Sequence, residues 1–90
     1  MKNEYELTAI LSRDYCTAQR ELRSYHHRMV EAEKKGDESE AKACRHMWEE
    51  SIGKRDYIPE LAEKLGVIIF FQQLCDQVNE ECDAKYGFDY

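Results

Sequence analysis

The sequence predicts an all-α protein: a small helical bundle built on a long antiparallel helical hairpin, with a short helix that starts at a proline and a C-terminal apolar helix. Apolar residues recur at steps of three and four over long segments, which is the period of a helix with one buried face. Only one short run favours a strand, and no second run is available to pair with it. Ninety residues predict a single domain, residues 1–90.

The strongest periodic segment predicts a helix over about residues 4–35. Asn3 is an acceptable N-cap, and Glu4 and Glu6 suit the positive end of the helix dipole. Gly36 can take the left-handed conformation that closes a helix. We call the apolar face of this helix the seam. The seam consists of Leu11, Tyr15, Ala18, Leu22, Tyr25, Met29 and Ala32. A helix of about 30 residues is about 45 Å long, so the seam needs partners along all of its length.

A second helix is expected over about residues 38–54. Asp37 or Ser39 can cap it, and the short connection predicts that it runs antiparallel to the first helix. Its apolar stripe includes Ala41, Cys44, Met47, Trp48 and Ile52. Because Trp48 is the largest side chain of this stripe, we expect it to anchor the core between the two helices.

Pro59 predicts a break in the chain after this helix. We expect the helix to falter at Gly53 and to end by Tyr57, because a proline disfavours helical backbone at the preceding residue. Proline is well suited to a first helical turn, so a short helix should span about residues 59–65.

The C-terminal helix is expected over about residues 67–86. Its first half is apolar on nearly all sides, which implies burial on more than one side. A strand over Val67–Phe71 is the alternative, because β-branched and aromatic residues favour strands. We prefer the helix, since the apolar spacing continues to Cys82 without a turn signal. Residues 87–90 form a short aromatic and acidic tail.

The net charge of the chain indicates which kinds of molecule it could bind. The chain carries 13 Lys and Arg against 19 Asp and Glu, a net charge of −6, which argues against general nucleic-acid binding and favours protein partners or small ligands. The basic residues concentrate in the first half of the chain. Its longest apolar run is far too short to span a membrane, and no export signal is apparent, so we expect a cytoplasmic protein. The four cysteines are then expected to be free thiols.

Motifs for catalysis and for metal binding are absent from the sequence. The cysteines and histidines show no Cys-x-x-Cys, His-x-x-x-His or Glu-x-x-His spacing. The serines lack a nucleophile-elbow context, and the glycines form no phosphate-binding loop. We therefore expect no metal site, no cofactor and no enzymatic activity.

A basic ribbon follows the first helix on the face opposite the seam. Its members are Arg13, Arg20, Arg23, His27, Arg28 and Lys34, four of them seven residues apart. The ribbon could hold the phosphates of an anionic ligand such as a nucleotide, or an acidic partner. The alternative is an ordinary solvated helix face, because outward positions of helices usually carry charge.

The eight residues from Glu60 to Val67 resemble the first helix and turn of a helix-turn-helix DNA-binding unit. This resemblance implies a DNA-binding regulator. The next helix of such a unit presents polar residues to the major groove, but here Ile68–Phe71 follow, so the pattern departs from the motif where base contacts are made.

The function that these observations favour is that of a non-catalytic, acidic binding protein, an adaptor, regulator or inhibitor that acts through protein contacts. Sequestration of an anionic ligand by the basic ribbon and DNA binding are the alternatives. Apolar surface in excess of what one short chain can cover also predicts a homo-oligomer, a dimer or higher. The residues expected at an oligomer or partner interface are Leu22, Tyr25, Met29, Ile68, Ile69, Phe70 and Phe71.

Overall fold

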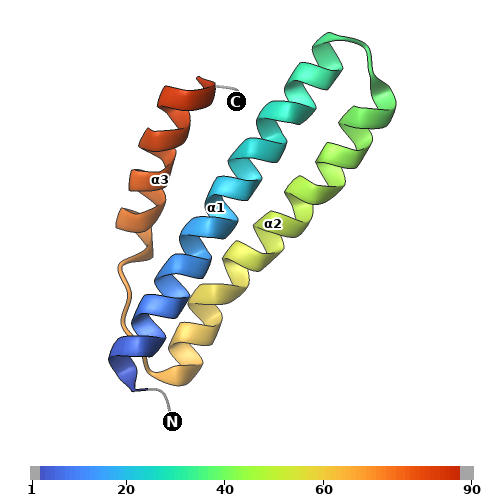
Figure 1. Ribbon diagram of the computed structural model, residues 1–90. Helices are drawn as coiled ribbons and strands as arrows, with labels where there is room; N and C mark the ends of the chain where they lie inside the picture. Colours follow the sequence, from blue (N-terminus) through green and yellow to red (C-terminus); the bar gives the residue numbers. More distant parts are fainter. Residues whose placement is uncertain (1–2, 88–90) are drawn as a thin grey trace.

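The computed structural model describes residues 3–87 and contains three α-helices in this range: α1 (Glu4–Lys34), α2 (Glu38–Leu65) and α3 (Phe71–Tyr86). α1 and α2 form a long antiparallel hairpin, and α3 packs on α1, so that α1 lies between the other two helices (Figure 1). The predicted all-α class and the helical hairpin are confirmed. Residues 1, 2 and 88–90, which include most of the expected aromatic tail, lie outside the described residues.

Side-chain caps and glycines set the ends of the hairpin helices. Asn3 accepts a hydrogen bond from the backbone N–H of Glu6, and Asp37 caps α2 by accepting one from Glu40. Gly36 has a φ of 75°, and the amides at 36 and 37 donate back to carbonyls of the last turn of α1. This is the Schellman arrangement, and it lets the three residues between α1 and α2 reverse the chain direction. The molecule is 49 Å long, about the length of α1 alone.

The seam forms most of the buried surface of α1. Six of its seven members are buried, and Tyr25 is half-buried. The expected role of Trp48 is corrected. Trp48 is only half-buried and packs on the ring of His26, with ring centroids 5.3 Å apart. The buried residues of the two hairpin helices include small ones such as Ala18 and Cys44 as well as Leu22 and Met29, whereas the tryptophan is only partly covered.

The predicted break between residues 54 and 59 is wrong, because α2 is one continuous helix with Pro59 inside it. Proline in a helix interior costs about 3 kcal/mol, since it removes one hydrogen bond and crowds the preceding turn. Burial on both sides of Pro59 offsets this cost: Ile58 and Ala62 pack against Leu11 and Tyr15 of α1. Residues 59–65 are thus the last two turns of α2 and not a separate helix.

The C-terminal helix begins at Phe71 and not at residue 67. Gly66, with a φ of 70°, ends α2, and the amide of Val67 donates to Ala62, so the chain leaves α2 in a second Schellman turn. Residues 67–70 form a connector without helix or strand. Side chains alternate along it: Val67 is buried and Ile69 half-buried, whereas Ile68 is 80 % and Phe70 71 % exposed. The apolar run thus has the period of two of an extended segment.

One core cluster joins the three helices near the end of the molecule where α1 begins. Leu11, Tyr15, Ile58 and Ala62 form its buried centre, and side chains of the connector and α3 pack against it. Tyr15 stacks at a tilt on Phe71, with centroids 4.8 Å apart. Burial, with a smaller contribution from Cys75, raises the pKa of Tyr15 to about 12. In residues 3–87, no helix combines the length and apolar character needed to cross a membrane.

Candidate functional site

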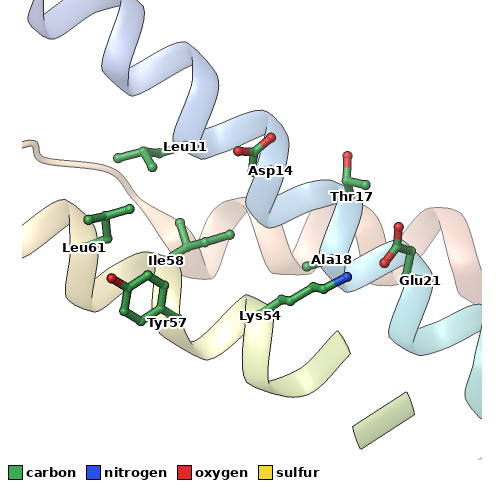
Figure 2. Close-up of a pocket in the computed structure, with 9 residues that line it drawn as sticks. All are labelled: Leu11, Asp14, Thr17, Ala18, Glu21, Lys54, Tyr57, Ile58 and Leu61. Atoms are coloured by element: carbon green, nitrogen blue, oxygen red, sulfur yellow. The ribbon is translucent and has the colours of Figure 1, made fainter. Parts of the chain in front are cut away.

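A groove of about 390 Å³ runs between α1 and α2. We call it the interhelical groove. Its lining residues are Leu11, Asp14, Thr17, Ala18, Glu21, Lys54, Tyr57, Ile58 and Leu61. In Figure 2, Asp14, Thr17 and Glu21 follow α1 along one wall, and Lys54 and Tyr57 follow α2 along the other. The apolar side chains lie between these walls (Figure 2).

The two walls of the groove differ in charge. On α1, Asp14 and Glu21 are seven residues, or two helical turns, apart on the same face. The one ion pair of Asp14 among the described residues is a 3.9 Å contact with its neighbour Arg13, and both side chains are more than half exposed. Within residues 3–87, neither Glu21 nor Lys54 forms an ion pair or a side-chain hydrogen bond. The groove therefore offers charged groups that the fold itself does not neutralise.

The opposite side of α1 holds α3 through charge. Arg20 Nε donates to Glu81 Oε2 at 2.7 Å, and Arg23 Nη2 donates to Asp83 Oδ1 at 2.6 Å. Arg23 is only 4 % exposed, whereas the side chains of the Arg20–Glu81 pair are each half exposed. The hydrogen bond from Arg20 holds the pKa of the Glu81 carboxyl below its ordinary value. Part of the predicted basic ribbon is therefore the surface on which acidic α3 packs.

A polar network continues this contact through all three helices. Asn79 Oδ1 of α3 accepts from Gln19 Nε2 at 2.8 Å and from Arg23 Nη1 at 3.0 Å. Gln19 Oε1 in turn accepts from Arg55 Nη1 of α2 at 2.9 Å. Every buried side-chain nitrogen and oxygen in residues 3–87 has a hydrogen-bond partner. A satisfied network of this kind fixes the position of α3 along α1, because sliding would leave buried polar groups unpaired.

The remaining members of the basic ribbon do not converge on one site. His27 stacks on Tyr86 of α3, with centroids 4.9 Å apart. Arg28 reaches Glu40 of α2, Lys34 reaches Glu31, and Arg13 contacts Asp14. An anionic ligand on this ribbon would compete with the α3 carboxylates for Arg20 and Arg23. Sequestration of a nucleotide therefore gains no support from the arrangement of these side chains.

The residues predicted for an oligomer or partner interface separate into two groups. Leu22 and Met29 are buried within the chain, Tyr25 lies under Arg28, and Ile69 and Phe71 pack on the core cluster. Ile68 and Phe70, both on the connector, remain exposed. Much of the apolar surface expected at an interface is thus covered by α2 and α3.

The cysteines and histidines do not form a metal-binding constellation in the described part of the chain, where no group of three or more His, Cys, Asp and Glu side chains is arranged to hold an ion. All four cysteines are free thiols. Burial raises the pKa of the Cys16, Cys44 and Cys82 thiols. Thiolate, the nucleophilic form, is therefore scarce at these three positions at neutral pH.

The segment that resembles a helix-turn-helix unit ends α2 and enters the extended connector. The helix that follows it, α3, exposes Asp76 and Glu80, and its other carboxylates face α1. Negative charge on an outward helix face opposes the DNA phosphates. The DNA-binding alternative is therefore disfavoured on electrostatic grounds.

Sequence reasoning missed the groove and most of the polar network. Cys16, Gln19 and Arg23 follow a three-four spacing directly beside the seam, and this second stripe is the signal that could have placed Arg23 in an interface. The sequence around Asn79 contains no such signal, because it does not predict which face of α3 packs against α1. Comparison with protein families, curated proteins and solved structures finds no match for this chain.

Proposed function

We propose that the protein is a non-catalytic binding module, an adaptor or inhibitor, that holds a helical segment of a partner protein in the interhelical groove. The single observation that carries this proposal is the unfilled position beside the hairpin. α3 occupies one side of α1, and the other side is a groove between charged walls. Leu11, Ala18 and Ile58 form its buried apolar floor, and Tyr57 and Leu61 are the apolar side chains that remain accessible in it. Such a groove is the usual receptor for the apolar face of an amphipathic helix.

Exposed apolar side chains of α2, in the groove and just beyond its end, support this proposal. Tyr57 is 51 % and Leu65 is 49 % exposed, and Leu61, between them at helical spacing, lies in the groove. Aromatic residues at the edge of an apolar groove are typical of protein-binding sites. The free thiols fit a reducing compartment, and we place this function in the cytoplasm.

Affinity capture with groove variants tests the proposal. Thr17 is exposed on the α1 wall, so Thr17→Trp should obstruct the groove without disturbing the core. Gln73→Trp places the same side chain on an exposed position of α3 and is the matched control. The immobilised wild type and the control should retain the same proteins from a cell extract, and Thr17→Trp should lose them. Equal retention by all three forms would show that the groove is not the binding site.

A further inference from the structure

The charge distribution on α1 indicates which helix the groove accepts. α1 separates its charges: Arg20 and Arg23 lie toward α3, and Asp14 and Glu21 lie on the groove wall. The helix that covers the basic side, α3, is acidic and places Glu81 and Asp83 against these arginines. On this side of α1, the helix that packs is therefore the one with complementary charge.

Charge complementarity on the groove side of α1, where Asp14 and Glu21 lie, would favour a basic helix. We propose that the groove receives an amphipathic helix of a partner protein whose apolar stripe is flanked by Lys or Arg residues seven positions apart. This proposal rests on the proposed function and specifies the partner. Asp14 and Glu21 are two turns apart, about 10.5 Å along α1, and basic residues one heptad apart on a helix lying alongside would face both of them.

Lys54 restricts the orientation in which a helix can bind in the groove. It stands on the α2 wall, and Figure 2 shows its side chain extending between the walls toward Ala18 and Glu21. A basic residue on the wrong flank of the bound helix would meet this ammonium group. The occupant therefore carries its basic residues on one flank only, and an acidic or neutral residue on the flank that faces Lys54.

A second copy of this chain fits the groove poorly. The outward face of its α3 carries Asp76 and Glu80, which would meet the carboxylates of Asp14 and Glu21. The six arginines, four on α1 and two on α2, each form an ion pair with a carboxylate of the same chain, so a second copy has no unpaired arginine to offer the groove. Like charges across the groove would therefore weaken the binding of a second copy at this site.

Two synthetic helical peptides with the same leucine stripe test the inference. One carries Lys at two flank positions seven apart, and the other carries Glu at the same positions. Fluorescence anisotropy with the full chain should show at least about tenfold tighter binding of the lysine peptide, with the preference declining as salt is added. The double variant Asp14→Lys, Glu21→Lys should invert the preference. The matched control, Glu49→Lys with Glu60→Lys, changes two exposed carboxylates outside the groove and should not.

Each other outcome overturns a defined part of the proposal. Equal binding of both peptides that Thr17→Trp abolishes would refute the basic helix and leave the groove as a binding site. Binding of either peptide that Thr17→Trp does not change would refute the groove itself. No binding of the lysine peptide would refute the basic helix, and the capture experiment would then decide on the groove. A wild-type dimer that Thr17→Trp dissociates would show that the occupant is a second copy.

Discussion

Arg23 and Asp83 form a 2.6 Å ion pair in which the arginine is almost completely buried and the aspartate is partly exposed. A buried guanidinium is costly unless its hydrogen bonds are satisfied, and here Asp83, Asn79 and the carbonyl of Gly87 all accept from it. The C-terminal helix thus supplies both the charge and the hydrogen bonds that allow Arg23 to lie inside the fold.

Replacement of Asp83 should show how strongly the fold depends on its pairing with the buried Arg23. We expect Asp83→Ala to lower the free energy of unfolding by about 2–3 kcal/mol, because a hydrogen bond to a charged group is lost and the guanidinium stays buried. Glu80→Ala removes an exposed carboxylate from the same helix and should change stability by less than about 0.5 kcal/mol. Denaturant unfolding of the two variants makes the comparison. Equal effects would mean that the pair does not hold Arg23 in place.

The Arg20–Glu81 pair should give a pH-dependent contribution of definite sign. The folded-state pKa of Glu81 lies below its ordinary value of 4.5, chiefly because Arg20 donates a hydrogen bond to the carboxylate. A lowered pKa stabilises the fold above pH 4.5, and this stabilisation is lost as the pH falls through the lowered value. An NMR titration should place the Glu81 midpoint below 4.5, and Arg20→Gln should return it toward 4.5. A midpoint that Arg20→Gln leaves unchanged would contradict this assignment.

Two glycines of α2 should respond oppositely to alanine. Gly53 lies inside the helix with open space around the position of a Cβ atom, so Gly53→Ala should stabilise the protein by about 0.4–1 kcal/mol. Gly66 ends the helix with a φ of 70°, and Gly66→Ala should destabilise it by about 1–2 kcal/mol. Thermal melts of both variants check the pair. Destabilisation by Gly53→Ala would indicate that α2 is interrupted there.

We expect the chain to self-associate through two exposed side chains of the connector. Ile68 and Phe70 are the members of the predicted interface that remain exposed. We expect light scattering to give a mass above the 10.7 kDa of one chain, and Ile68→Ser with Phe70→Ser to return the mass to that of a monomer. A wild type that is monomeric at every accessible concentration would refute the homo-oligomer prediction.

Local patterns predicted the hairpin because its determinants are local. The seam, the Asn3 and Asp37 caps and Gly36 each act within a few residues, and the structure confirms them. The errors at Pro59 and at residues 67–70 have a different cause. At Pro59, the burial of Ile58 and Ala62 outweighs the cost of a proline inside the helix. At residues 67–70, a Schellman turn ends α2 and changes the chain direction before the apolar run begins.

The candidate site was less predictable, since its features are shared between helices. The outward position predicted for Arg23 is wrong, because α3 packs on that part of α1 and pairs Asp83 with the arginine. The groove likewise depends on how α2 lies against α1 and on which side α3 leaves open. No periodicity within one helix contains that information.

α3 has 16 residues and contacts the rest of the molecule mainly through α1. Helices of this length are marginal in water on their own, so α3 should be helical only while it is docked. Its amide protons should then exchange with solvent together, through one cooperative undocking event at a lower free energy than global unfolding. The long hairpin would persist through that event, and the protein would have two levels of stability within a single small domain.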